Sequence, residues 1–342
     1  QKITRFFITD DNFARNREWE AIFDRLAKLR EEDKIPLGLM IQVDTMCHAI
    51  PRFIEKAHRA GVTRVFIGLE NINPDNLVSA KKKQNKITEY RKMLLAWKQH
   101  GIFVYAGYIL GFPGDTPESI RRDIAIIQRE LPLELLEFNI LTPLPGSEDH
   151  KVLWQKGVPM DADLNKYDLE HVVTDHPKMT RDELQQIYTE AWSLYYTREH
   201  MVTLLRRAAV TKVPMMSLAK VLVQFSTMMQ LENVHPLQSG LFRMKRRSER
   251  RPTLPRESAF AFYPRYFRDL IVRNAIFVRT IFWVLSVKRG IERDPNRFAY
   301  TDRALTPVTE AEEEEFDFLT KTAGARAAID HLKKVHALTH AH

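Results

Sequence analysis

Short runs of apolar residues alternate with helical patterns over the first 141 residues of the chain. Five of these runs have the length and composition of strands, and they recur about every 30–40 residues, as successive βα units do. The strands are predicted at residues 3–8, 37–43, 64–69, 102–110 and 135–141. The run from 102 to 110 is apolar at nearly every position, which is typical of a strand buried on both faces.

The intervals between these strands carry apolar residues at helical spacing, with signals at the helix ends. Gly61 and Gly101 stand where two of the helices are expected to end in a left-handed residue. Thr116, Pro117 and Glu118 predict a helix start, because they provide an N-cap hydroxyl, a proline at the first helical position and an acid near the positive helix end. The apolar stripes are Trp19, Ile22, Phe23, Leu26 and Leu29; Phe53, Ile54 and Ala57; Met93, Leu94 and Trp97; and Ile120, Ile124, Ile127 and Leu131.

A succession of five βα units predicts an α/β fold with a parallel sheet. A complete eight-stranded barrel needs about 250 residues of this rhythm, whereas here the rhythm ends after the fifth strand. Two architectures remain, an open partial barrel and a doubly wound sheet. In both of them, ligands bind at the carboxyl ends of the strands.

Polar or glycine-rich segments follow all five predicted strands. Carboxylates and amides gathered at one end of a sheet can bind an amine, a ribose diol or a metal ion. The simpler explanation for Asp10, Asp11 and Asp115 is that each caps the turn or helix that follows. A hard-cation site formed by Asp10, Asp11, Asp44 and Glu70 is a further alternative. The segments are residues 9–12, 42–44, 68–71, 107–115 and 142–147.

The single cysteine, Cys47, excludes an intrachain disulfide and is expected to be a buried, inert thiol. One cysteine and no signal-peptide pattern lead us to expect a cytoplasmic protein. His171, His176 and His200 could act as general acids or bases, although ordinary polar roles explain them more simply. The sequence contains no phosphate-loop or dinucleotide-binding fingerprint.

The second half of the chain is predicted to be helical and basic. Residues 197–300 contain 20 Lys and Arg against 7 Asp and Glu, a net charge of +13, while the whole chain carries +8. Such a block attracts nucleic acid, anionic lipid or phosphorylated substrates, or it is simply a solvated surface. Thr180 and Glu183 predict a capping box at the start of one helix.

Residues 266–287 form an apolar, aromatic helical pattern that Arg268, Asp269, Arg273 and Arg279 interrupt. These charges make it a poor transmembrane segment, but an aromatic helix with arginines can lie on a membrane surface. The alternative is a helix packed on the barrel. A basic cluster at 245–251 is expected in a linker, and an acidic run at 310–315 is expected at a solvated helix start.

Four motifs, in the order and at the spacing of barrel strands, resemble the radical-SAM superfamily. They are residues 6–13 (FFITDDNF), 68–71 (GLEN), 107–116 (GYILGFPGDT) and 143–147 (PLPGS). The sequences of these motifs are most similar to those of the large group with an N-terminal cobalamin-binding domain, which includes bacteriochlorophyll ring cyclase-like and hopanoid methylase-like enzymes. The resemblance extends from residue 1 to about 200 and implies an open (β/α)6 barrel. It also implies an enzyme in which a [4Fe–4S] cluster cleaves S-adenosylmethionine and generates a 5′-deoxyadenosyl radical.

The resemblance assigns cofactor-facing positions to the strand ends. Asp10, Asp11 and Asn12 correspond to the second-strand motif near the methionine amine, and Glu70 to the fourth-strand position that faces S-adenosylmethionine. The third-strand end, where polar contacts to the cofactor or substrate are expected, carries Gln42 and Asp44. The positions near adenine are Gly107, Ile109 and Gly111 on the fifth strand, and Leu141 to Pro143 at the end of the sixth.

The chain departs from this family in one large respect. The family's cluster ligands, Cys-x3-Cys-x2-Cys, follow the first barrel strand, whereas this chain begins at the position of the second. Cys47 cannot replace three thiolates, because cluster ligation requires all of them. We therefore expect a partial barrel without its first strand, an N-terminally truncated portion that is inactive by itself. A cobalamin domain would also lie upstream.

Three functional interpretations follow. The first is the C-terminal portion of a radical-SAM enzyme, cobalamin-dependent and acting on a hydrophobic lipid or tetrapyrrole. The second is a non-catalytic scaffold whose basic half binds a partner or a membrane surface. The third, a nucleic-acid-binding protein, lacks a recognisable reading motif. The expected organisation is a partial barrel at 1–150, a helical segment at 151–205 and a basic helical region at 206–342.

Overall fold

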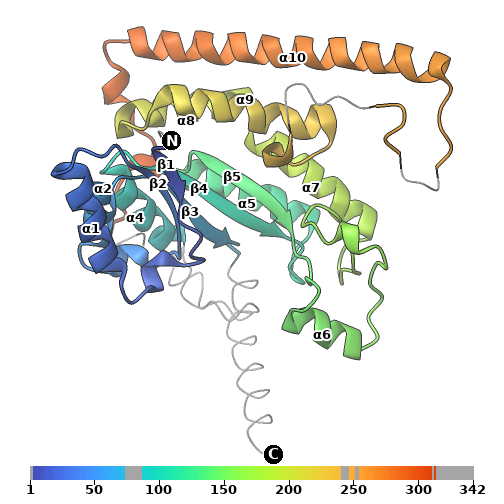
Figure 1. Cartoon of the computed structure of the whole chain (residues 1–342), viewed down its shortest axis with the longest axis horizontal. Helices are drawn as coiled ribbons and strands as arrows, with labels where there is room; N and C mark the ends of the chain where they lie inside the picture. The colour runs from blue at the N-terminus through green and yellow to red at the C-terminus, as the bar shows by residue number, and fades with distance from the viewer. Residues whose placement is uncertain (1–2, 74–86, 240–245, 251–253, 310–311, 313–342) are drawn as a thin grey trace, which may run out of the picture.

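Five parallel strands form one sheet at the centre of the molecule (Figure 1). The structure is a computed structural model, and it describes residues 3–73, 87–239, 246–250, 254–309 and 312. The strands are β1 (Arg5–Phe7), β2 (Gly38–Val43), β3 (Val62–Glu70), β4 (Phe103–Leu110) and β5 (Leu135–Ile140). All five predicted strands are confirmed, and their ends differ from the prediction by no more than two residues.

The strands lie side by side in chain order, and each pairs in parallel with the next. A doubly wound sheet reverses its strand order at a switch point, and this order from β1 to β5 has no reversal. The helices between the strands therefore cover a single face of the sheet. They are α1 (Trp19–Glu31), α2 (Phe53–Ala60), α4 (Ile87–Lys98) and α5 (Pro117–Glu130). Of the two predicted architectures, the open partial barrel is confirmed.

Burial alternates along β2 because only one face of this strand lies under the helices. Leu39, Ile41 and Val43 are buried on the helix-covered face, whereas Met40 and Gln42 on the other, inner face are only half-buried. The strand β4 is buried at almost every position, as its continuous apolar run predicts. The inner face of β2 and β3 is thus the part of the sheet that is open to a ligand.

The helix ends follow the signals in the sequence. Gly61 ends α2 with a φ of 99°, and Gly101 follows α4 with a φ of 66°. The Thr116 hydroxyl accepts a backbone hydrogen bond at the start of α5. The predicted capping box of Thr180 and Glu183 opens α7 (Arg181–Tyr195). These predictions are confirmed because capping depends on residues that are close in sequence.

Beyond β5 the chain is helical. The short α6 (Glu148–Gln155) lies near the carboxyl end of β5, and α7 packs beside α5 on the helix-covered face (Figure 1). The contact between α7 and the sheet is aromatic, with the rings of Trp192 and Phe138 5.4 Å apart. The helical C-terminal region predicted from the sequence is therefore confirmed.

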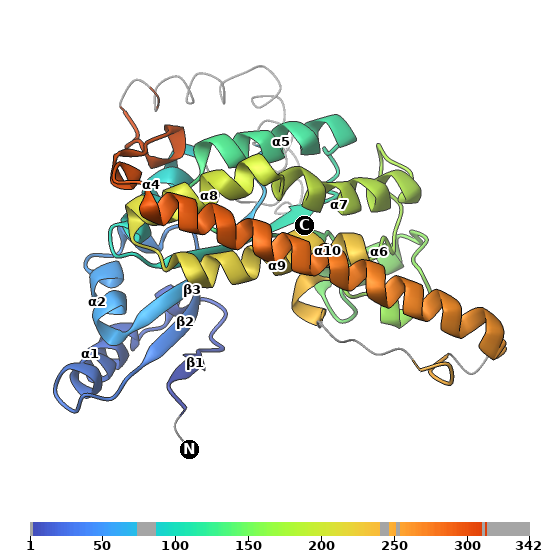
Figure 2. The same cartoon turned by 90° about the horizontal axis from the view of Figure 1, so that it is seen from above.

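The three helices that follow form a layer at the amino-terminal end of the sheet (Figure 2). They are α8 (Arg198–Thr211), α9 (Met215–Glu232) and α10 (Ala259–Arg293), and α10 packs on both α9 and α8. On α8, Arg207 donates hydrogen bonds to the carbonyls of Gln128 and Leu131, at the carboxyl end of α5 just before β5. On α9, the ring of Phe225 lies 6.0 Å from that of Tyr105, near the start of β4. We call α8, α9 and α10 the basal layer.

Helix α10 is the longest helix in the described part of the chain and extends beyond the predicted 266–287 at both ends. Its buried residues, Phe277, Val284 and Lys288, face the other two helices of the basal layer. Most of its other side chains are exposed, including large apolar ones. By length and composition alone, α10 is apolar enough to cross a membrane despite its arginines.

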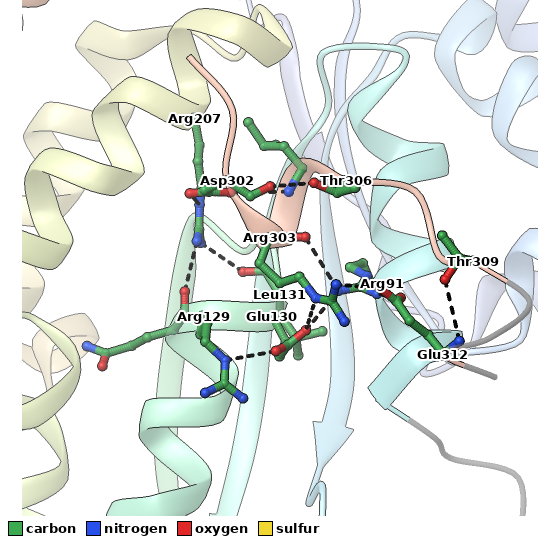
Figure 3. Close-up of polar contacts among 12 residues, drawn as sticks. Arg91, Arg129, Glu130, Leu131, Arg207, Asp302, Arg303, Thr306, Thr309 and Glu312 are labelled. Atoms are coloured by element: carbon green, nitrogen blue, oxygen red, sulfur yellow. Dashed lines mark hydrogen bonds and ion pairs between the residues drawn. The ribbon is translucent and has the colours of Figure 1, made fainter. Parts of the chain in front are cut away.

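The segment after α10, residues 294–309, lies against α8 and α5, and ion pairs hold it there (Figure 3). We call this segment the strap. Asp302 of the strap accepts a hydrogen bond from Arg207 Nε at 2.7 Å. Arg303 pairs with Glu130 of α5, which also pairs with the almost fully buried Arg91 of α4. The strap thus ties the end of α10 to two helices on the covered face of the sheet.

Two charged runs were predicted to be solvated or in a linker. Glu312 is instead half-buried and bonded to Arg91, so the prediction of a solvated acidic run is wrong at this residue. The other residues of 310–315 lie outside the described part of the chain. In the basic cluster, Arg247 and Arg250 bond to Glu257, whereas Lys245 and Arg251 lie outside the described residues.

The two edge strands of the sheet, β5 and β1, differ in their hydrogen-bond partners outside the sheet. At β5, the Tyr196 hydroxyl accepts a hydrogen bond from Leu136 N–H and donates one to the Leu136 carbonyl. Farther along this edge, the Ile140 N–H donates to the Leu169 carbonyl at 2.7 Å. At the other edge, β1 has no second partner strand among the described residues. The edge at β5 is therefore covered, and the edge at β1 is open.

Candidate functional site

A polar pocket of about 320 Å³ lies at the carboxyl ends of the first three strands. Parallel strands that run in the same direction bring their end loops together at one rim, which explains why distant segments meet here. The pocket is lined by Asp11 and Asn12 after β1, residues 42–46 at the end of β2, and Phe66, Gly68 and Glu70 on β3. Among the sequence-predicted site residues, Asp11, Asn12, Gln42, Asp44 and Glu70 are thereby brought together.

Asn12 and Asp44 connect the ends of β1 and β2 through a reciprocal pair of hydrogen bonds. Asn12 Nδ2 donates to Asp44 Oδ2 at 3.1 Å, and the Asp44 N–H donates to Asn12 Oδ1 at 3.2 Å. Arg15 Nε donates to the same carboxylate oxygen at 2.7 Å. Burial acts to raise the pKa of Asp44, but hydrogen bonds from Asn12, Arg15 and the Met46 N–H outweigh it and hold the pKa below its usual range. Asp44 is thus a fixed, ionised carboxylate.

Glu70 stands at an irregular end of β3. The pairing of β3 with β4 shifts register between Gly68 and Glu70, and Glu70 has a φ of 61°, in the left-handed region. A bulge of this kind redirects a side chain at the end of a strand. Its carboxylate lies over Gly68 on the inner face, where an added Cβ would be 3.4 Å from Glu70 Oε1. The buried Asn71 fixes the next position by donating to the Ile109 carbonyl.

Among the residues that the structure describes, carboxylates outnumber cations at this pocket. Asp11, Asp44 and Glu70 contribute carboxylates, and Arg15 is bonded to Asp44 at its rim. The amides of Asn12 and Gln42 add both donors and acceptors. Such a lining suits a ligand that combines positive charge with hydroxyl groups.

The alternative of a hard-cation site does not form in the described residues. No group of three or more His, Cys, Asp or Glu side chains there is placed to hold a metal ion. Asp10 is directed into its own turn, where it accepts hydrogen bonds from the Asn12 N–H at 3.0 Å and from Asn16 Nδ2 at 2.8 Å. It does not line the pocket, so the simpler capping explanation holds for Asp10.

The predicted adenine-facing residues do not line this pocket either. The place of a Cβ at Gly107 lies 3.1 Å from the ring of Phe66, so this glycine makes room for a neighbouring strand's side chain. Gly111 has a φ of 94° and packs against Leu184 of α7. The remaining three residues differ in exposure: Ile109 is half-buried, Leu141 is exposed and Pro143 is buried. Contact of these five residues with an adenine stays a prediction.

Sequence analysis missed several lining residues. Phe66 lies two positions before Gly68 and four before Glu70, so strand alternation could have placed it on the same face. Thr45 and Met46 follow Asp44 directly in the chain. Arg15 gave no signal, because its role depends on a contact with Asp44 that only the folded sheet creates.

The nucleophile and acid–base candidates have structural roles. Cys47 is fully buried, and burial raises its pKa to about 12, so its thiol is not reactive near neutral pH. His200 is also buried, which lowers its pKa to about 3. His176 holds the Phe112 carbonyl at 2.7 Å, and His171 pairs with Asp168 on the surface. The prediction of ordinary polar roles fits His171 and His176, whereas the ring of His200 packs 4.7 Å from that of Tyr195.

The sequence of residues 1–127, which contains β1 to β4 and the whole pocket, matches the radical SAM superfamily. This part of the chain is therefore similar to the radical SAM superfamily. The resemblance of the strand-end motifs is thereby confirmed.

Two curated relatives show where in the superfamily the similarity lies. Bacteriochlorophyllide d C-12(1)-methyltransferase of Chlorobaculum tepidum is 27% identical over 187 residues, covering 54% of this chain and 39% of the relative. Hopanoid C-2 methylase of Rhodopseudomonas palustris is 30% identical over 156 residues, covering 44% of this chain and 28% of the relative. The chain spans less than half the length of these two relatives.

A solved structure of the radical SAM methyltransferase TsrM from Kitasatospora setae, with cobalamin and a [4Fe–4S] cluster bound, is also similar. It is 19% identical with a TM-score of 0.35, and the match covers 40% of this chain and 26% of that one.

Radical SAM enzymes use S-adenosylmethionine and a [4Fe–4S] cluster. The pocket at the strand ends fits the first of these, because its carboxylates and amides match a cofactor that carries an ammonium, a sulfonium and a ribose diol. The chain's residues do not fit the cluster. Its single cysteine, Cys47, is buried beneath the sheet's covered face with a raised pKa, and a cluster needs several thiolates.

Proposed function

We propose that the polar pocket at the ends of β1 to β3 binds S-adenosylmethionine and contributes this half of the cofactor site to a radical SAM enzyme. The observation that supports it is the convergence of Asn12, Asp44 and Glu70 in one pocket within the segment that matches the radical SAM superfamily. Asp44 and Glu70 would accept hydrogen bonds from the ammonium or from the ribose hydroxyls. The lining amides would orient the cofactor between them.

Calorimetry with S-adenosylmethionine tests this proposal. Glu70→Gln keeps the size of the side chain but removes its charge, and we expect Kd to rise about tenfold, since hydrogen bonds to charged groups contribute about 1.5–3 kcal/mol. Glu55→Gln is the matched control, because Glu55 carries the same charge on the surface of α2, where it pairs with Arg52. We also expect S-adenosylhomocysteine, which lacks the sulfonium charge, to bind more weakly. Equal effects of the two substitutions would contradict the proposal.

The reaction is proposed to be modification of a hydrophobic small molecule, of the tetrapyrrole or hopanoid kind that the relatives' names describe. The cluster thiolates, and a cobalamin if one is used, would come from outside this chain. The chain alone should therefore bind S-adenosylmethionine without cleaving it. Incubation with dithionite and S-adenosylmethionine should give no 5′-deoxyadenosine, and formation of that product would show that the assignment of the cluster ligands is wrong.

The second proposed function is contact with a membrane surface through α10. Phe260, Ile271 and Phe282 are each at least 69% exposed on this helix, and exposed arginines, Arg268 and Arg279, lie among them. An exposed apolar helix that bears cations is attracted to anionic bilayers both by burial of its side chains and by charge. A non-catalytic scaffold would use this surface alone.

Vesicle flotation tests the membrane contact. We expect the protein to float with vesicles that contain phosphatidylglycerol and to bind less at high salt, because salt screens the arginines. The double substitution Ile271→Ser and Phe282→Ser should abolish flotation. Trp154→Ser is the control, since Trp154 is 72% exposed on α6, far from the basal layer. Flotation that is unchanged by the double substitution would contradict the proposal.

A further inference from the structure

A second cavity, of about 500 Å³, lies within the basal layer between α9 and α10. Its volume falls within the range of about 300–1,000 Å³ that is usual for small-molecule sites. Aliphatic and aromatic side chains make up most of its wall. The lining residues are Met216, Ala219, Lys220, Val223, Gln224 and Met228 of α9, Ser239, and Phe277, Ile281, Val284 and Leu285 of α10.

The polar side chains of the wall are already bonded to the protein. Gln224 Nε2 donates to the Pro236 carbonyl at 2.6 Å, and the Ser239 hydroxyl donates to the same carbonyl at 2.6 Å. They leave little for a polar ligand or an ordered water, and apolar cavities stay dry and accept apolar guests. The inner wall therefore favours a hydrocarbon.

Lys220 is the exception in this lining. It is exposed, and within the described ranges no carboxylate lies at ion-pair distance from it. Its ammonium can therefore pair with an anion at the mouth of the cavity. A ligand that satisfies both features has an apolar chain and an anionic end.

We propose that this cavity binds one hydrocarbon chain of an anionic membrane lipid, with the charged end of the lipid beside Lys220. The same helix provides the reason to name a membrane lipid. One side of α10 forms a wall of the cavity through Phe277 and Val284, while the other side exposes Phe282 and Arg279 to solvent. A bilayer that meets the exposed side of α10 would deliver lipid chains to the edge of the cavity.

This site is separate from the proposed S-adenosylmethionine pocket, which lies at the other end of the strands. It shares α10 with the proposed membrane contact, but it can be tested without a bilayer. Failure of vesicle flotation would overturn the membrane as the source of the ligand but not the binding of a hydrocarbon chain in the cavity, and failure of the cavity test would leave the membrane contact standing.

The test uses cis-parinaric acid, a fluorescent fatty acid, added below its micellar concentration to the full chain in vesicle-free buffer. We expect saturable, stoichiometric fluorescence enhancement with a Kd in the micromolar range. Lys220→Glu should weaken binding at least fivefold, because it places a negative charge beside the carboxylate. The control is Lys151→Glu on α6, which changes the net charge by the same amount at an exposed lysine. Equal weakening by both substitutions, or no saturable binding to the unmodified chain, would overturn the proposal.

A second variant separates the cavity from the exposed side of α10. Ala219→Phe should fill the space between α9 and α10 and abolish parinarate binding, with thermal unfolding checked to confirm that the variant is folded. Ile271→Ser should leave parinarate binding unchanged, because Ile271 does not line the cavity. If Ile271→Ser abolishes binding while folded Ala219→Phe retains it, the probe binds the outer surface of α10 and the proposal is wrong.

Discussion

Glu70 combines a functional side chain with an unfavourable backbone. Its φ of 61° lies in the left-handed region, which costs a residue with a Cβ about 1–2 kcal/mol. The bulge beside Gly68 keeps the carboxylate over the inner face in spite of that cost. The backbone at Glu70 thus lowers the stability of the fold, and the same backbone places the carboxylate over the inner face of the sheet.

Two substitutions at this position separate its backbone from its carboxylate. Glu70→Ala and Glu70→Gly both remove the side-chain charge, but only glycine adopts this φ without strain. We expect the glycine variant to be more stable than the alanine variant by about 1 kcal/mol in urea unfolding, and both to lose affinity for S-adenosylmethionine. If alanine is the more stable of the two, the backbone at Glu70 is not strained.

Asp123 on α5 is a buried carboxyl with an unusual titration. Burial is the main cause that raises its pKa from 3.8 to about 6, and Tyr108 is its neighbour at 3.4 Å. The folded state thus holds its proton to higher pH than the unfolded state does. The stability linked to Asp123 is full below pH 3.8, and it is lost as the pH rises through about 6.

Asp123→Asn should remove this loss. We expect the variant to gain up to about 3 kcal/mol over the unmodified chain at pH 7.5, from a shift of about two pKa units, and to gain little at pH 4. Chemical unfolding at the two pH values measures the difference. A gain of the same size at both pH values would mean that ionisation of Asp123 is not its cause.

At the scale of single residues, only part of the pocket could be predicted from the sequence. Residues directly after strands, such as Asn12 and Asp44, were placed at the pocket because parallel strands share an end. Asp10 was assigned to the cofactor by resemblance, yet it is bonded within its own turn. Which way a loop side chain points depends on local hydrogen bonds that a strand pattern does not contain.

At the scale of elements, prediction depended on how local the cause is. Strands and caps follow from neighbouring residues, so β1 to β5 and the start of α5 were found. Strand order is a long-range property, and periodicity alone could not distinguish the partial barrel from a doubly wound sheet. The strap is the extreme case, since Arg91 donates a hydrogen bond to the Arg303 carbonyl across 212 positions of the chain.

Arg207 provides the ion pair by which the strap meets the basal layer, and Arg206 provides a ring contact. Its guanidinium, 5% exposed, bonds to Asp302 and to the carbonyls of Gln128 and Leu131. We expect Arg207→Met to destabilise the protein by about 3–5 kcal/mol, because it removes the cation that pairs with the Asp302 carboxylate and leaves two carbonyls without their donor.

The matched control for this prediction is Arg206→Met, which removes the same charge one position earlier. Arg206 is exposed and lies 5.7 Å from the Tyr300 ring, an interaction of about 0.5–1 kcal/mol. Urea unfolding compares the two variants. Similar losses at both positions would show that the strap contacts of Arg207 contribute little to stability.

For the whole molecule, the two proposed sites lie at opposite ends of the sheet. The polar pocket is at the carboxyl ends of the strands, and the basal layer with α10 is at their amino-terminal ends. If α10 rests on a bilayer, the pocket opens away from that bilayer. A hydrophobic substrate would then have to leave the membrane before reaching the cofactor.

The open edge of β1 has a consequence for how the chain behaves in solution. Ile3 and Phe7 are more than half exposed at this edge, and an apolar strand with no second partner strand among the described residues is a template for pairing with another copy. We expect self-association that increases with protein concentration, measurable by light scattering after size-exclusion chromatography. Phe7→Lys should reduce it, whereas Phe298→Lys, at a residue 59% exposed away from any strand edge, should not. If both substitutions reduce the association equally, general surface hydrophobicity drives it. If only Phe7→Lys reduces it, the association occurs through the edge of β1.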